Sequence, residues 1–174
     1  MKKRLLTVMA LMMAFAAVGA ISCGSDKAKE NDNKPESAVL AMNSAQTDLG
    51  KVMKISNVAT RQPGKAVNFT WNENGKDVTF AEYTKNKVVF LNFWATWCGP
   101  CKMEIPEIIE LYKEMKPQGV VFLGVSLDRD KTEDAIVTKI NKFVQDKKIN
   151  YNNFIGNEKI VSEYGGIRSI PTTL

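Results

Sequence analysis

Two continuous apolar runs stand out in the second half of the chain. Residues 87–94 (KVVFLNFW) and 119–127 (GVVFLGVSL) have strand length and few polar positions, as expected for strands buried on both faces. Apolar residues recur at helical spacing between these runs, over 98–116, and again after them in a segment that begins near Asp130. Strands that alternate with helices in this way predict an α/β fold with a mostly parallel central sheet.

Weaker signals surround this pattern. Residues 66–71 (AVNFTW) and 76–80 (KDVTF) resemble short strands, and the Asn-Gly between them indicates a hairpin with a loop longer than two residues. Asp130, followed three residues later by Glu133, predicts a capping box at the start of the second helix. The pair Gly165–Gly166 should end a short third helix that follows a weak strand. The hairpin is thus expected to precede the alternating strands and helices.

The N-terminal third of the chain lacks this periodicity. Basic residues, an apolar stretch too short to span a bilayer and a few small residues predict an export signal over 1–22. Cys23 follows directly, which resembles the lipobox of bacterial lipoproteins, where the cysteine is acylated. The sequence AISC lacks the usual leucine three residues before the cysteine, so an ordinary signal with a stray cysteine is the alternative. Residues 23–61 are predicted to be a flexible tether, and 62–174 the folded domain.

Composition excludes some partners and some chemistry. The hydrophobic fraction of 44% and the charged fraction of 25% are those of a chain that folds. The net charge of +5 comes mostly from Lys2, Lys3 and Arg4, and the rest of the chain is nearly balanced, which argues against a nucleic-acid partner. The chain has no histidine and therefore lacks the commonest general base and metal ligand.

Three interpretations compete for Cys98 and Cys101, which are separated only by Gly99 and Pro100. A zinc site needs four ligands, and the only other cysteine is Cys23. A structural crosslink over so short a loop restricts the unfolded chain very little. A redox pair fits best, because the N-terminus of a helix stabilises a thiolate and lowers the pKa of its cysteine. Cys98 would then be the nucleophile, and Cys101 would resolve the mixed disulfide.

The residues around this pair resemble a known family. FWATWCGPC is similar to the active site of the thioredoxin superfamily, and CKMEIPE together with the exported N-terminus resembles its membrane-tethered TlpA/ResA-like bacterial branch. YGGIRSIPTT resembles the second signature of the superfamily, and the resemblance covers about residues 67–174. It implies a thioredoxin-like α/β fold, with a mostly parallel sheet flanked by helices and an N-terminal β-hairpin. It implies no cofactor other than the redox-active disulfide, and no metal.

The resemblance also implies roles for individual residues. Cys98 would attack the substrate disulfide and Cys101 would release the product. Pro171 would be cis and would face the cysteine pair, while the backbone of Ile170 would pair with an extended substrate. Trp97 would form an apolar lip of the same groove beside Gly99 and Pro100, whereas Trp94 is better explained by packing in the core.

One position departs from cytoplasmic thioredoxins. These carry a buried aspartate where this chain has Asn92, and an asparagine cannot serve as a base. The branch that the chain resembles has an acid three residues after the second cysteine, and Glu104 occupies that position. One helical turn separates Cys101 from Glu104, so the carboxylate could take up and return the cysteine proton. The alternative is a solvated helix glutamate.

Gly99-Pro100 is the dipeptide of reducing thioredoxins, so the resemblance implies a reductant in an oxidising compartment. We expect a thiol-disulfide oxidoreductase on the periplasmic side of the cell envelope that reduces protein disulfides, for example those of apocytochrome c. A membrane thiol donor would recharge it, and a lipid anchor at Cys23 would keep it at the membrane. Two alternatives remain: a non-catalytic thioredoxin-scaffold lipoprotein that only binds, and a peroxiredoxin-like peroxide reductase.

The last residues lead to a further expectation. In the family fold, the segment after the cis-proline is an antiparallel strand beside the active-site strand, followed by another strand and a helix. The chain stops at Leu174, so we expect a partial sequence in which the terminal strands and helix are missing. If it is the whole product, it should be poorly folded and weakly active.

Overall fold

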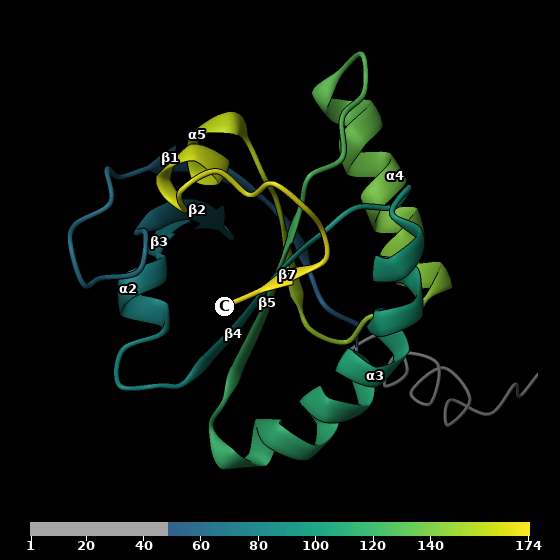
Figure 1. Ribbon diagram of the computed structural model, residues 1–174, viewed down its shortest axis with the longest axis horizontal. Helices are drawn as coiled ribbons and strands as arrows, with labels where there is room; N and C mark the ends of the chain where they lie inside the picture. The colour runs from purple at the N-terminus through teal and green to yellow at the C-terminus, as the bar shows by residue number, and fades with distance from the viewer. Residues whose placement is uncertain (1–48) are drawn as a thin grey trace, which may run out of the picture. The chain divides into compact units, whose positions relative to one another are not determined.

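The structure is a computed structural model that describes residues 49–174 (Figure 1). The predicted export signal, Cys23 and most of the predicted tether lie outside the described residues. Within residues 49–174, no helix has both the length and the apolar character needed to cross a membrane.

A seven-stranded mixed sheet forms the centre of the domain, in the order β3-β2-β1-β6-β5-β4-β7. The pairs β1–β6, β6–β5 and β5–β4 are parallel, whereas β2–β1, β3–β2 and β4–β7 are antiparallel. The predicted α/β fold with a mostly parallel centre is therefore confirmed. The strands are β1 (Val52–Val58), β2 (Phe69–Glu73), β3 (Lys76–Thr79), β4 (Val89–Trp94), β5 (Val121–Ser126), β6 (Asn152–Ile155) and β7 (Thr172–Thr173).

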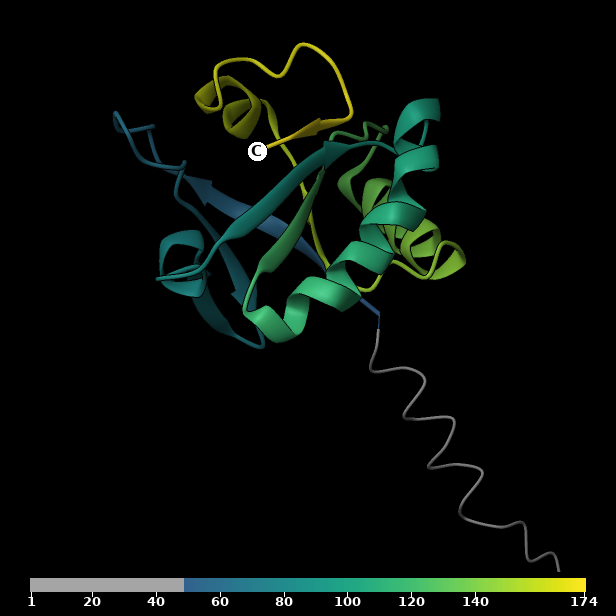
Figure 2. The same cartoon turned by 60° about the horizontal axis from the view of Figure 1, so that its bottom comes forward.

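Helices cover both faces of this sheet, α3 and α4 on one face and α2 and α5 on the other (Figure 2). The strands alternate their side chains between two apolar clusters: Leu91 and Phe93 pack toward α2 and α5, whereas Trp94 packs toward α3 and α4. Both faces of β4 are thus buried, as its apolar sequence predicts. The helices are α2 (Phe80–Tyr83), α3 (Gly99–Met115), α4 (Glu133–Asp146) and α5 (Glu158–Glu163), with a 3₁₀ turn at Lys116–Gln118.

The hairpin β2–β3 is tighter than the sequence indicates. Glu73 pairs with Lys76, so only Asn74 and Gly75 form the loop. Both have positive φ, 54° and 82°, as a type I′ turn requires. The prediction of a longer loop was wrong because both strands extend further toward the turn than their apolar residues do.

The second helix also begins differently from its prediction. Its N-cap is Thr132, whose side chain accepts a hydrogen bond from the backbone N–H of Ala135 at 3.2 Å. Asp130 instead accepts from the N–H of Lys131, and Glu133 is the first residue of α4. The predicted capping box is therefore absent, and a simple threonine N-cap stands two residues later, since a threonine hydroxyl accepts the same backbone N–H bond as an aspartate does.

The first strand corrects the predicted boundary between tether and domain. Residues 52–58, assigned to the tether, form β1, which lies between β2 and β6. Only Met53 and Val58 are buried in it, and its pairing with β2 shifts register between Ile55 and Asn57. This bulge interrupts the alternation of apolar and polar residues by which a strand is recognised.

Replacing Gly50 by alanine should destabilise the domain by about 1–3 kcal/mol or more. A Cβ atom at this position would lie 1.7 Å from the backbone oxygen of Tyr151, so β1 could not keep its place beside β6. Chemical denaturation of the purified protein measures the effect. Gly99→Ala is the matched control, because a Cβ there meets nothing within 4 Å. Equal stability of Gly50→Ala and the parent would contradict the place of β1 in the sheet.

Three partly or fully buried tyrosines predict a loss of stability at alkaline pH. Burial raises the pKa of Tyr164 from 10.0 to about 12, and burial also raises the pKa values of Tyr83 and Tyr151. Because each folded-state pKa lies above the unfolded one, the unfolded chain loses its protons first. The melting temperature should be constant up to about pH 9 and should fall as the pH rises from about 10 to 12.

Tyr151→Phe provides a check on this account. The Tyr151 hydroxyl is buried and has no hydrogen-bond partner among the described residues. Its removal should change stability at pH 7 by no more than about 1 kcal/mol, and should reduce the loss at pH 11. A large loss at pH 7, or an unchanged alkaline transition, would contradict the assigned cause.

Candidate active site

The local fold brings Cys98 to the start of a helix. Strand β4 ends at Trp94, and a tight turn follows that is closed by the N–H of Cys98 donating to the carbonyl of Ala95 at 3.1 Å. Helix α3 then begins at Gly99, with Cys98 as its N-cap. The Cys98 sulfur accepts a hydrogen bond from the N–H of Cys101 at 3.2 Å. An otherwise unpaired helix N–H thus points at the sulfur that is expected to carry negative charge.

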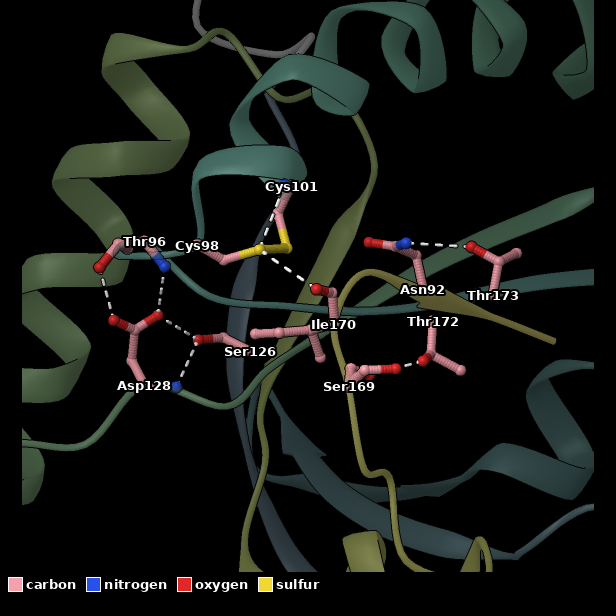
Figure 3. Close-up of a disulfide and its surroundings, with 10 residues drawn as sticks. All are labelled: Asn92, Thr96, Cys98, Cys101, Ser126, Asp128, Ser169, Ile170, Thr172 and Thr173. Atoms are coloured by element: carbon pink, nitrogen blue, oxygen red, sulfur yellow. Dashed lines mark hydrogen bonds between the residues drawn. A yellow bond between two sulfur atoms is a disulfide. The ribbon is translucent and has the colours of Figure 1, made fainter.

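Cys98 and Cys101 form a disulfide in this structure (Figure 3). Cys98 is 4% exposed and Cys101 is 1% exposed, and both belong to the apolar cluster under α3 and α4. Both cysteines are thus buried, and Cys98 is slightly the more exposed of the two. In the oxidised form the pair can accept two electrons, and in the reduced form it can donate them.

The segment before β7 lies against this disulfide. The Ile170 carbonyl oxygen is 3.7 Å from the Cys98 sulfur, although 72 positions separate the two residues in the sequence (Figure 3). The peptide bond between Ile170 and Pro171 is cis. Ile170 makes no backbone–backbone hydrogen bond within residues 49–174. Its backbone is therefore available to an extended chain that approaches Cys98.

A surface groove of about 380 Å³ lies next to Trp97 and Ile170, the sequence and spatial neighbours of Cys98, and neither cysteine lines it. Trp97 lines it from the β4 side and is 63% exposed, which is unusual for so large an apolar side chain. Gly99 and Pro100 are exposed on the first turn of α3 but do not line this groove. The structure thus brings Trp97 and Ile170 together in the lining of the groove and leaves Gly99 and Pro100 outside it. The lining residues are Trp97, Leu127, Ile167, Arg168, Ser169 and Ile170.

Glu104 lies one helical turn after Cys101 and is half-buried. Its Oε2 is buried without a hydrogen-bond partner among the described residues, and the same is true of the Tyr151 hydroxyl. The two groups are close enough that the charge of Glu104 contributes, after burial, to raising the pKa of Tyr151. The unpaired Glu104 oxygen thus belongs to a side chain one helical turn from Cys101 on α3.

Asn92 and Trp94 have structural contacts. Asn92 is buried and donates from Nδ2 to the Thr173 hydroxyl at 3.0 Å, which links β4 to β7 (Figure 3). Trp94 is fully buried and donates from its indole N–H to Asn153 Oδ1 at 3.0 Å. The interpretation of Trp94 as a core residue is therefore confirmed.

Sequence reasoning missed a second acidic residue near the site. The side chain of Asp128, in the loop after β5, is 0% exposed and accepts hydrogen bonds from Thr96 and Ser126. Asp128 follows directly on the apolar run 119–127, and an acid at the end of a buried parallel strand is the signal that would have identified it. Within residues 49–174, no group of three or more histidine, cysteine, aspartate or glutamate side chains is arranged to hold a metal ion.

Curated relatives share this part of the chain. It is 33% identical over 109 residues to the thiol-disulfide oxidoreductase ResA of Bacillus subtilis (strain 168), covering 62% of this chain and 57% of that protein. It is 36% identical over 114 residues to ResA of Bacillus thuringiensis (strain Al Hakam), covering 64% and 62%. The matched part thus spans somewhat less than two thirds of the length of these relatives.

Solved structures support the fold. A thiol:disulfide interchange protein of the thioredoxin family from Chlorobium tepidum TLS superposes with a TM-score of 0.53 at 26% identity, covering 66% of this chain and 79% of that one. A putative thiol-disulfide oxidoreductase from Bacteroides vulgatus superposes with a TM-score of 0.51 at 29% identity, covering 68% and 79%. The predicted thioredoxin-like fold is therefore confirmed. The AhpC/TSA family matches residues 63–174, which is more than half of the chain and includes the cysteine pair and the cis-proline. The chain accordingly belongs to the AhpC/TSA family, and its relatives include the ResA thiol-disulfide oxidoreductases.

Proposed function

We propose that the protein reduces disulfides of other proteins through a dithiol–disulfide cycle of Cys98 and Cys101. The observation that carries this proposal is the position of the Cys98 sulfur. It accepts an N–H at the start of α3 and lies 3.7 Å from the carbonyl of Ile170, whose backbone has no other backbone partner among residues 49–174. A thiolate is stabilised there, and an extended substrate can lie along the same edge. The ResA relatives support the assignment by their names as thiol-disulfide oxidoreductases.

The reaction begins with the dithiol form. The Cys98 thiolate attacks one sulfur of the substrate disulfide, which forms a mixed disulfide and releases the other substrate sulfur as a thiolate. Cys101 then gives its proton to Glu104 and attacks the Cys98 sulfur, and the second substrate thiolate leaves. The protein ends with the Cys98–Cys101 disulfide, and the substrate gains two electrons. The Glu104 proton is returned to a departing thiolate.

We further propose that the protein works on the periplasmic side of the cell envelope and is held at the membrane through Cys23. The support is the sequence alone: the predicted export signal over 1–22 and the lipobox-like position of Cys23. In an oxidising compartment the disulfide form must be reduced again after each cycle. A membrane protein that donates electrons through thiols can supply that step, and a lipid anchor would keep the two partners together.

A single-turnover experiment tests the proposed activity. Pre-reduced protein is mixed with insulin, whose interchain disulfides are accessible, and the thiols of each partner are counted after acid quenching. We expect one insulin disulfide to be reduced for each Cys98–Cys101 disulfide formed. Oxidation by hydrogen peroxide but not by insulin would instead support a peroxide reductase. If the dithiol reacts with neither, the protein is a binding scaffold.

A further inference from the structure

The side chain of Asp128 is a buried acid that the proposed chemistry does not use. Its Oδ2 accepts from the backbone N–H of Thr96 at 2.8 Å and from the hydroxyl of Ser126 at 2.8 Å. Its Oδ1 accepts from the Thr96 hydroxyl and lies 3.3 Å from the ammonium of Lys139 on α4 (Figure 3 shows the bonds to Thr96 and Ser126). Both oxygens are thus engaged, which is how a buried carboxylate offsets the loss of its hydration.

These bonds join the two loops that form one wall of the groove. Thr96 lies in the turn after β4, directly before Trp97, and Asp128 lies in the loop after β5, directly after Leu127. Trp97 and Leu127 both line the groove. Between the loops, the N–H of Leu127 donates to the carbonyl of Trp94 at 2.8 Å. Asp128 therefore accepts bonds from Thr96, which precedes Trp97, and from Ser126, which precedes Leu127.

Trp97 needs such a support. Because 63% of its surface is exposed, packing alone restrains it weakly, unlike Trp94 and Trp71, which are fully buried. Thr96 precedes it and donates both its N–H and its hydroxyl to the one buried carboxylate. These two bonds restrict the turn that carries Trp97. Within residues 49–174, the hydrogen-bond partners of the Cys98 sulfur are Ile170 and Cys101, not Asp128.

We propose that Asp128 is a positioning residue for the substrate groove, which holds Trp97 and Leu127 in register for an extended protein substrate. The identity of the substrate, a protein disulfide, rests on the proposed reductase function, whereas the contacts of Asp128 do not depend on it. The Lys139 ammonium pairs with this carboxylate from α4, at 3.3 Å from Oδ1. A small disulfide can reach Cys98 without contact with the groove wall, so its reduction rate should not depend on Asp128. A protein disulfide uses the wall and should bind less well without it.

The test compares two substrates in two variants. Asp128→Asn retains the shape but replaces one acceptor oxygen by an NH₂ donor, which then faces the donors of Thr96 or Ser126. Thr96→Val keeps the shape of the turn and removes only the hydroxyl. The control is Asp130→Asn, an exposed acid whose one hydrogen bond within residues 49–174 comes from the N–H of its neighbour Lys131. For the Asp128 and Thr96 variants we expect KM for insulin to rise about tenfold, with kcat and the rate with a small aromatic disulfide within about twofold of the parent.

A readout independent of activity accompanies the kinetics. Trp71 and Trp94 are fully buried, so acrylamide quenches mainly the fluorescence of Trp97. The quenchable component should lose anisotropy faster in Asp128→Asn and in Thr96→Val than in Asp130→Asn. Unchanged Trp97 motion, or equal losses with the protein and the small disulfide, would overturn the proposal. If Asp128→Asn does not fold, Thr96→Val decides the question. If the parent reduces neither substrate, the proposed function fails, and the Trp97 motion alone decides whether Asp128 positions the groove.

Discussion

Replacing Cys101 by serine is expected to trap the protein in a covalent adduct with its substrate. In this variant Cys98 still lies at the start of α3, where the helix N–H groups stabilise its thiolate. It can attack a substrate disulfide, but the thiol of Cys101 that would release the product is gone, so the mixed disulfide accumulates. Non-reducing electrophoresis and mass spectrometry of the variant after incubation with insulin should show a one-to-one adduct that dithiothreitol dissolves.

Cys98→Ser is the matched control for this experiment. A serine hydroxyl is not ionised near neutral pH, so this variant should form no adduct and should lose roughly 10³-fold or more of the reductase rate. Its buried Cys101 should also react slowly with alkylating agents, since it is 1% exposed. Equal trapping by both variants would contradict the assignment of Cys98 as the nucleophile.

Replacing Glu104 by glutamine is expected to slow the release of the mixed disulfide by about 10²–10⁴-fold, the range for loss of a general base. The glutamine keeps the shape of the side chain, but it cannot accept the proton of Cys101. The first attack, by Cys98, should proceed at the parent rate, so the transient adduct should become visible by rapid acid quenching.

Glu107→Gln is the control on the same helix, because Glu107 is exposed and lies one turn further from the cysteine pair. It should leave both steps unchanged. If Glu104→Gln behaves like Glu107→Gln, Glu104 is a helix glutamate without a part in the reaction. A slower first step in Glu104→Gln would instead indicate a disturbed α3.

The parts of the fold that sequence reasoning predicted are those set by local pattern. The runs that became β4 and β5 are apolar at nearly every position, because both faces of the sheet are covered. Cys98 and Cys101 were identified together because only Gly99 and Pro100 separate them and a helix begins between them. Strand β1 was missed because its burial depends on β2 and β6, and its bulge removes the alternation.

Contacts between residues far apart in the sequence could not be predicted from local sequence patterns alone. The approach of Ile170 to Cys98 was expected only from the resemblance to the thioredoxin superfamily, since nothing local to residues 165–174 indicates a neighbour. Asp128 was missed because its bonds to Thr96 depend on the parallel register of β4 and β5, which sets Trp94 opposite Ser126. That register brings the two following loops to the same edge of the sheet.

The reduction potential of the Cys98–Cys101 pair tests the central claim most directly. The purified protein is equilibrated with dithiothreitol or glutathione buffers of known potential, and the fraction of free thiols is measured after alkylation. A reductant of protein disulfides should titrate as one two-electron couple near the thioredoxin value of about −270 mV. A potential near that of a strong oxidant, about −120 mV, would reverse the direction of electron flow. A pair that does not cycle at all would contradict the proposed function.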